Sequence, residues 1–205
     1  MLKHPTETQN REMYDVARRM AILAEYRDPG IAHHIDRIYG YCRVLAYGLG
    51  LSNQEAELTA TASMLHDLGK VIVPFDVLQK AASLTNAEWE LVQRHPQTGA
   101  DILRGSPASV MQLGETIALT HHERWDGSGY PNSLIEEEIP LSGRICGVAD
   151  VFDALTTTRP YNDQVSVAEA LELIRSASGT LFDPQVVKVF VAQFEELCRV
   201  RTQNI

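Results

Sequence analysis

Residues 52–70, which read SNQEAELTATASMLHDLGK, join a helix start to two chemically active side chains. Ser52 and Glu55 stand three residues apart, which is the spacing of the capping box that begins a helix. Apolar residues then recur at helical spacing as far as the adjacent His66 and Asp67,. The stretch therefore predicts a helix that ends on one nitrogen ligand and one oxygen ligand.

The helical pattern extends along the whole chain. Further capping boxes begin at Thr85 and Ser166, and Asp183 before Pro184 gives another helix start,. We find no alternating strand pattern bounded by hairpin turns, so we predict an all-α fold. The expected helices cover residues 10–26, 32–49, 53–66, 86–104, 108–121, 142–157, 166–178 and 184–201.

Length and composition are those of one ordinary globular unit. With 205 residues, 44% of them hydrophobic and 22% charged, the chain can bury a core and shows no sign of disorder. Its net charge of −9 argues against a nucleic-acid polymer as partner, because that binding needs a cationic surface,. No apolar run approaches the roughly 20 residues that span a bilayer, so we expect a cytoplasmic protein without membrane attachment.

The three cysteines, Cys42, Cys146 and Cys198, are widely spaced and lie outside any C-x-x-C pattern. We expect them to be reduced and mostly buried, and we expect neither a disulfide framework nor a zinc–thiolate site. A metal site in this chain would then use nitrogen and oxygen ligands, which suit iron or manganese at least as well as zinc.

Five of the seven histidines stand beside helix ends or acidic residues. An isolated histidine is more often a hydrogen-bonded, half-buried side chain than a ligand, but the joint occurrence favours a metal. Asp150 strengthens this interpretation, because a carboxylate inside the apolar stretch 145–155 needs a buried partner. Two long irregular segments, 68–84 and 123–141, begin beside these histidines, and loops of that length are usually functional. The residues of the cluster are His34, His66, Asp67, His95, His121 and His122.

Four strings carry a resemblance to a known family: HDLGK at 66–70, HHERWDGSGYP at 121–131, ADVFDALTTTRPY at 149–161 and FDP at 182–184. With His34 they follow the H…HD…D order of the HD phosphohydrolase superfamily, and the Gly129-Tyr130-Pro131 loop resembles its HD-GYP branch. The resemblance implies an HD-domain helical bundle in which the GYP loop lies over a His/Asp metal centre.

The same resemblance implies the ligands of two divalent metal ions. His34, His66, Asp67 and Asp150 would form the core site, and Asp67 would bridge to a second ion. Such a pair activates water for attack on a phosphodiester. We expect iron or manganese, with zinc, nickel or cobalt as substitutes. The second ion would be held by His95, His121 and His122.

Further residues receive roles from these motifs. Lys70, Tyr130 and Arg159 would contact substrate phosphates, and Lys70 would act in catalysis beside Asp67. Without the motifs around them, Lys70 and Arg159 would be interpreted as ordinary surface cations, and the GYP segment as a surface turn. The residues expected behind the ligands, where they would orient the histidines or the lysine, are Glu123, Asp126 and Asp153.

Four positions depart from the family pattern. Gly30 stands four residues before His34, where many members have a glutamate associated with a third metal, so we expect two metals here. Asn162 replaces the lysine of R-P-Y-K. Ser133 and Glu136 replace the glycines that usually follow the GYP triad. These changes leave the chemistry intact but bear on efficiency and substrate preference.

Large apolar residues outside the motifs are expected to pack within the fold. We interpret Trp89 as core packing, and Trp125 as loop packing near enough to the GYP segment to touch a guanine. The chain divides into an N-terminal extension, 1–26, and an HD-GYP domain, 27–205. A helical face of the extension would pack on the domain, with a homodimer interface as the second interpretation and a signalling protein as another partner. This face consists of Met13, Val16, Met20 and Leu23.

The resemblance implies hydrolysis of cyclic di-GMP to pGpG, to GMP or to both. Two alternatives remain open. The domain could be a weakly active or inactive module that binds a cyclic dinucleotide or a protein, or it could hydrolyse another nucleotide, such as a mixed cyclic dinucleotide. Retention of all seven expected ligands favours catalysis, and the intact loop with Tyr130 favours a cyclic dinucleotide over a monophosphate.

Overall fold

The computed structural model describes residues 7–26, 30–80, 82–157 and 164–203, and no strand is present among them. The all-α prediction is confirmed. The helices are α1 (Glu7–Ala24), α2 (Ile31–Gly48), α3 (Asn53–Ser63), α4 (Phe75–Leu78), α5 (Asn86–Val92), α6 (His95–Leu103), α7 (Ser109–Thr120), α8 (Leu141–Thr156), α9 (Val167–Ser176), α10 (Pro184–Ala192) and α11 (Phe194–Gln203), with 3₁₀ turns η1 (Leu68–Ile72) and η2 (Glu136–Glu138).

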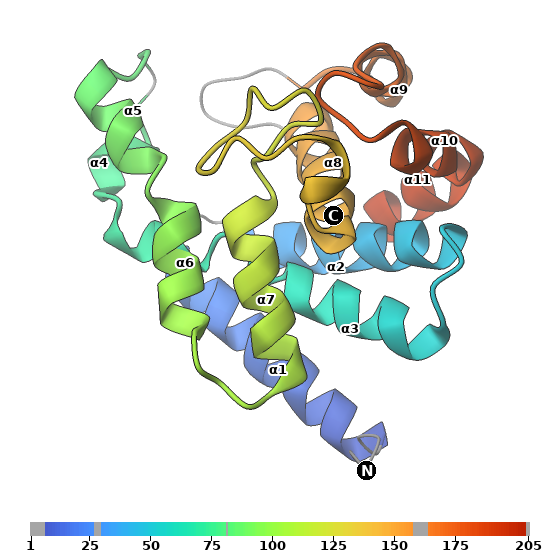
Figure 1. Cartoon of the computed structure of the whole chain (residues 1–205), viewed down its shortest axis with the longest axis horizontal. Helices are drawn as coiled ribbons and strands as arrows, with labels where there is room; N and C mark the ends of the chain where they lie inside the picture. Colours follow the sequence, from blue (N-terminus) through green and yellow to red (C-terminus); the bar gives the residue numbers. More distant parts are fainter. Residues whose placement is uncertain (1–6, 27–29, 81, 158–163, 204–205) are drawn as a thin grey trace.

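Helix α2 is the central element of the fold. It packs against α1, α3, α8 and α11, and α7 packs against α3, α6 and α8 (Figure 1). Tyr41 of α2, Phe152 of α8 and Phe190 of α10 are all fully buried, and each neighbouring pair of rings makes an edge-to-face contact. A buried aromatic side chain contributes roughly 1.5–3 kcal/mol relative to an exposed one. This cluster therefore anchors the C-terminal helices to α2.

Helix starts follow the local signals in the sequence. The capping boxes at Ser52, Thr85 and Ser166 are all formed, with each hydroxyl accepting from the backbone N–H three residues later. Asp183 caps α10 by accepting from the N–H of Gln185. These side chains satisfy backbone donors that a helix leaves unpaired at its start.

Two expected helices are each divided in two. Residues 86–104 form α5 and α6, because Pro96 has no N–H to continue a helix and lies in the first turn of the second one,. Residues 184–201 form α10 and α11, which separate at Gln193. No glycine or proline marks that second break, so the sequence holds no local signal for it.

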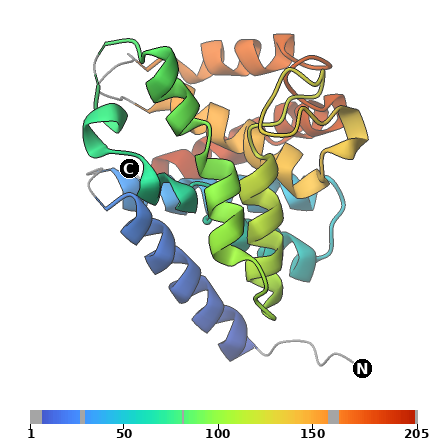
Figure 2. The ribbon, with the colours of Figure 1, turned by 60° about the vertical axis from the view of Figure 1, so that its left-hand side comes forward.

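Helix α1 packs on the rest of the domain through part of the expected face, because Met13 and Met20 are partly buried against the core. Ala17 and Ala21 are buried against α2 and the end of α3, whereas Val16 and Leu23 are 45% and 72% exposed. Two alanines one helical turn apart allow α1 to approach α2 closely. Figure 2 shows α1 running along one side of the molecule.

Two of the sequence motifs lie in segments that connect helices. The HDLGK string lies where α3 passes into η1, and the GYP string lies in the long segment between α7 and α8. None of the described helices is both long and apolar enough to cross a membrane. All three cysteines are free, with Cys42 and Cys146 buried and Cys198 partly buried.

Candidate metal centre

Seven side chains from five parts of the chain meet in two adjacent groups. In each group the ligand atoms lie within 4.8 Å of one another. The first group takes His34 from α2, His66 from the end of α3 and Asp150 from α8. The second group consists of Asp67, His95, His121 and His122. The structure thus brings together every ligand that the sequence motifs suggested.

Three of the histidines are oriented by the ends of the helices that precede them. His66 Nδ1 lies 2.9 Å from the carbonyl oxygen of Ser63, His95 Nδ1 lies 2.7 Å from that of Val92, and His121 Nδ1 lies 3.0 Å from that of Ala118. A carbonyl oxygen only accepts, so each Nδ1 carries the proton and donates it. In each ring Nε2 is then the atom that can bind a metal.

The Nε2 atoms converge on Asp67. Its Oδ1 lies 3.2 Å from His95 Nε2 and 3.7 Å from His121 Nε2, and its Oδ2 lies 3.2 Å from His66 Nε2. Because the two carboxylate oxygens face different imidazoles, Asp67 stands between the two groups of ligands.

The arrangement leaves buried atoms that a cation would satisfy. His66 Nε2 and Asp67 Oδ1 are buried without a hydrogen-bond partner among the described residues. His95 Nε2 and His121 Nε2 lie 3.4 Å apart with both lone pairs facing each other, a spacing close to the ~3 Å between two nitrogen ligands of one ion. These seven residues therefore fit a divalent metal centre.

Electrostatics at the centre also favour positive charge. Burial opposes protonation of His66, but Asp67 and Asp150 raise its pKa to about 9, so a metal ion that binds Nε2 displaces a proton from it. Burial likewise disfavours the charged form of Asp67, yet Lys70 and His66 hold the pKa of its carboxyl well below the ordinary value. Burial lowers the pKa of His121 and of His122, which keeps those imidazoles neutral as a ligand must be,.

Asp153 lies behind the first group of ligands. Its Oδ2 lies 2.7 Å from His34 Nδ1, and its Oδ1 accepts from Arg37 Nε at 2.6 Å. Asp153 is 1% exposed, so this ion pair is shielded from water. The carboxylate fixes the His34 ring in the orientation that directs Nε2 toward His66 and Asp150.

Lys70 lies at the edge of the centre between two carboxylates. Its Nζ donates to Asp67, and it also lies 3.1 Å from Oε2 of Glu25, which directly follows α1. Despite burial, Asp67 and Glu25 raise the pKa of Lys70 above its ordinary value, so it stays an ammonium at neutral pH. Glu25 keeps this cation next to the centre.

The backbone of the HDLGK string packs tightly on the start of α6. A Cβ atom at Gly69 would lie 1.9 Å from the carbonyl oxygen of His95 and 2.5 Å from the N–H nitrogen of Gly99. Only glycine permits this approach. Gly69 therefore brings Asp67 and His95 to the same point.

The GYP loop closes over the second group. The Tyr130 ring stacks on the His122 ring at 4.8 Å between centroids. Burial raises the pKa of the Tyr130 hydroxyl, which remains a hydrogen-bond donor. Glu123 accepts from the N–H groups of Asn132 and Leu134, so it fixes the GYP loop instead of orienting a histidine or Lys70.

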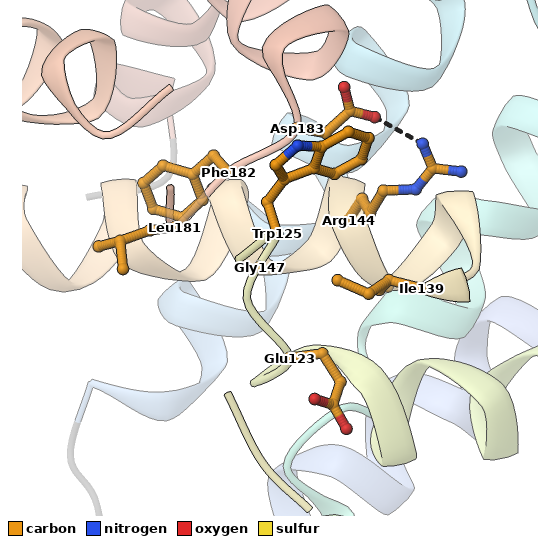
Figure 3. Close-up of a pocket in the computed structure, with 9 residues that line it drawn as sticks. Glu123, Trp125, Ile139, Arg144, Gly147, Leu181, Phe182 and Asp183 are labelled. Carbon is orange, nitrogen blue, oxygen red and sulfur yellow. Dashed lines mark hydrogen bonds and ion pairs between the residues drawn. The ribbon is translucent and has the colours of Figure 1, made fainter. Parts of the chain in front are cut away.

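Asp126 lies differently from the sequence interpretation, whereas Trp125 packs in its loop as expected. Asp126 is exposed and accepts from the N–H of Ser128, so it shapes a turn and does not lie behind the ligands. The Trp125 ring packs beside Arg144, 5.7 Å from its guanidinium carbon, and lines a small cavity near the Arg144–Asp183 ion pair (Figure 3).

The departures from the family pattern have visible backbone consequences. Ser133 and Glu136 have φ of 54° and 48°, so their backbone adopts the left-handed conformation in which glycine is favoured. Gly30 precedes α2 as its N-cap. Arg159 and Asn162 lie outside the described residues.

Sequence reasoning missed Arg37 and Glu25. Arg37 follows His34 by three positions, which places both on one face of α2, and its location between Ile35 and Ile38 was a signal that it needed a buried partner. Glu25 had no such signal, because its contact with Lys70 joins residues 45 positions apart.

Comparison with known proteins places this chain in a family. Residues 18–186 match the family model described as HD domain. The chain is 41% identical over 201 residues to the cyclic di-GMP phosphodiesterase response regulator RpfG of Xanthomonas campestris, covering 97% of this chain and 53% of that protein. It is 40% identical over 195 residues to 3'3'-cGAMP-specific phosphodiesterase 2 of Vibrio cholerae, which covers 95% of this chain and 37% of that protein.

The chain thus spans about half the length of these relatives, or less. A solved structure of an HDG"Y"P protein from Bdellovibrio bacteriovorus has the same fold, with a TM-score of 0.64 at 20% identity over 92% of this chain and 64% of that one. The family model, the order of the ligand motifs and the GYP loop lead to one conclusion: this chain belongs to the HD domain family, in its HD-GYP branch.

Proposed function

We propose that this chain hydrolyses a phosphodiester bond of a cyclic dinucleotide with the help of two divalent metal ions, and that cyclic di-GMP is its substrate. The observation that carries the proposal is the position of Asp67, whose two oxygens face imidazoles of different groups. Relatives that match most of this chain are named as phosphodiesterases of cyclic di-GMP or of 3'3'-cGAMP, which supports this class of substrate.

The ligand set favours iron or manganese. Histidine nitrogen and carboxylate oxygen supply all seven candidate ligands, and such a set suits these ions at least as well as zinc. We assign His34, His66 and Asp150 to one ion, and His95, His121 and His122 to the other, with Asp67 shared. When bound, the ions supply Lewis-acid activation of water and of the phosphate.

The remaining residues bind and orient the substrate. The Lys70 ammonium, held by Glu25, lies where it can contact a phosphate oxygen beside Asp67. The protonated Tyr130 hydroxyl can donate a second hydrogen bond. We also assign to Arg159 a hydrogen bond to a substrate phosphate. Water attacks the phosphorus, the bond to the leaving ribose oxygen breaks, and linear pGpG is released; a second hydrolysis gives GMP.

Product analysis tests the proposal. We would reconstitute the protein anaerobically with Fe(II) or Mn(II), incubate it with cyclic di-GMP, and separate the products by chromatography. Asp67→Asn keeps the side-chain shape and should lower turnover by more than roughly 100-fold, since loss of an outer-shell partner alone costs 10–100-fold. Asp101→Asn on α6 is the matched control, because Asp101 is exposed and should leave turnover unchanged.

The outcomes separate the alternatives. Metal analysis should find two ions per wild-type chain and fewer in Asp67→Asn. An absence of turnover at full metal occupancy would overturn the hydrolase and support a binding module. Turnover of 3'3'-cGAMP but not of cyclic di-GMP would keep the hydrolase and correct the substrate.

A further inference from the structure

An exposed tryptophan lies next to the GYP loop. Trp89 was expected in the core, but it is 47% exposed. Its helix, α5, contains no buried residue and stands at the edge of the molecule, away from the C-terminal helices (Figure 1). Core packing therefore does not explain why a large aromatic residue occupies this position.

Polar contacts fix the start of α5. Glu88 accepts from the backbone N–H of Thr85, and Lys80 donates to both oxygens of Glu88, at 2.6 and 2.8 Å. Because Glu88 directly precedes Trp89, the same contacts hold the backbone that carries the indole. The ring is thus presented at the surface from a fixed turn.

A row of aromatic rings connects Trp89 with the metal centre. The indole and Tyr130 make an edge-to-face contact, with centroids 6.2 Å apart and planes at 74°. Tyr130 in turn stacks on His122, and His122 contacts His95. Trp89 therefore lies at the outer end of a row whose inner end consists of candidate metal ligands.

We propose that Trp89 is a stacking subsite for one purine base of the substrate, with Tyr130 at the edge of that base, an inference that rests on the proposed function. A base is joined to its phosphate through a ribose, so when a phosphate lies at the metal ligands its base lies farther out, where Trp89 is. A base stacked on the indole would be nearly perpendicular to the Tyr130 ring and would present its edge to that ring. Exposed aromatic faces bind bases in this way irrespective of base identity.

Trp125 is the alternative tryptophan and is arranged differently. Its ring packs beside Arg144, and it shares a cavity with Phe182 and Asp183 (Figure 3). The Trp125 backbone N–H donates to the carbonyl oxygen of Leu181. Trp125 therefore joins the GYP segment to the C-terminal part of the fold.

Two measurements on the metal-loaded protein test the subsite. Loss of one base–aromatic stack corresponds to roughly 5- to 150-fold weaker binding. Since stacking acts equally on bound substrate and transition state, Trp89→Ala should raise KM by this factor and leave kcat within about 2-fold. Trp89→Phe should recover most of the loss. Tyr47→Ala on α2 is the control, because Tyr47 is another exposed aromatic residue, 58% exposed.

Fluorescence supplies a readout that does not need turnover. Cyclic di-GMP should quench the indole emission of Trp125→Phe, in which Trp89 is the remaining tryptophan, and should not quench that of Trp89→Phe. The KM increase in Trp89→Ala should be the same for 3'3'-cGAMP. Unchanged KM and unchanged quenching in the Trp89 variants, with an active wild type, would overturn the subsite alone. If the wild type is inactive, quenching of the Trp89 emission still supports the subsite. An absence of this quenching rejects the subsite.

Discussion

Replacing Asp153 by asparagine tests whether one buried carboxylate holds two helices and a histidine together. Asp153 Oδ1 accepts from Arg37 Nε at 2.6 Å, while Oδ2 lies 3.0 Å from Arg37 Nη2 and 2.7 Å from His34 Nδ1. An amide of the same shape has one accepting oxygen. Either orientation of the asparagine therefore turns its NH₂ group toward an N–H of Arg37.

The size of the effect follows from these contacts. Removing one partner of a buried ion pair costs about 3–5 kcal/mol, and asparagine keeps one acceptor, so we expect Asp153→Asn to lose about 2–4 kcal/mol at pH 7. Each kcal/mol lowers Tm by roughly 2–4 °C in a domain of this size. The affinity for the ion bound by His34 should also fall by roughly 10–100-fold.

The same contacts make the stability of the protein depend on pH. Burial disfavours the Asp153 carboxylate, but hydrogen bonds from His34 and Arg37 lower its pKa to about 2 from 3.8. That shift corresponds to about 2 kcal/mol, within the range expected from the contacts. Because the folded-state pKa is depressed, the stabilisation is complete above pH 4 or so and is lost as the pH falls toward 2. The difference between wild type and Asp153→Asn should shrink over that interval.

Thermal unfolding followed by circular dichroism measures this prediction. Asp15→Asn is the control, since the Asp15–Arg19 pair on α1 is exposed, with side chains 57% and 75% accessible, and such pairs contribute roughly 0–1 kcal/mol. A melting temperature of Asp153→Asn within 2 °C or so of wild type at pH 7 would refute the reasoning.

Two backbone predictions follow from the loops. Gly69→Ala should destabilise the protein by about 3 kcal/mol, because the new Cβ would meet the His95 carbonyl oxygen and the Gly99 nitrogen; an unchanged denaturant midpoint would contradict this. Ser133→Gly and Glu136→Gly should each stabilise by about 0.5–1 kcal/mol, since relief of a left-handed φ gains roughly 1–2 kcal/mol and the freedom of glycine in the unfolded chain offsets part of it,. Lower midpoints in both variants would show that their loop is not strained.

The helical fold could be predicted from local sequence, because hydrophobic periodicity and capping residues act over a few positions. The capping boxes at Ser52, Thr85 and Ser166 are formed as expected. Pro96 indicated the break between α5 and α6, but apolar residues keep their helical spacing across it, so the sequence suggested a single helix. The break at Gln193 had none, since it depends on how α10 and α11 pack on the core.

The ligands could be predicted because they lie in recognisable strings. Their surroundings could not, because they depend on contacts between distant residues. Arg37 and Asp153 are separated by 116 positions and meet only when α2 packs on α8. Trp89 was misplaced for a related reason: a hydrophobic residue on a periodic helix indicates burial, yet α5 buries none of its residues.

The hydrogen bonds from His66, His95 and His121 to preceding carbonyl groups connect metal affinity with folding. Ser63 and Val92 are the last residues of α3 and α5, and Ala118 lies in the last turn of α7. Such carbonyls have no partner within their own helix. The imidazole rings therefore lose their rotational freedom when the helices form, before an ion arrives. The centre is preorganised, and any change that frays one of these helix ends should weaken metal binding without altering a ligand.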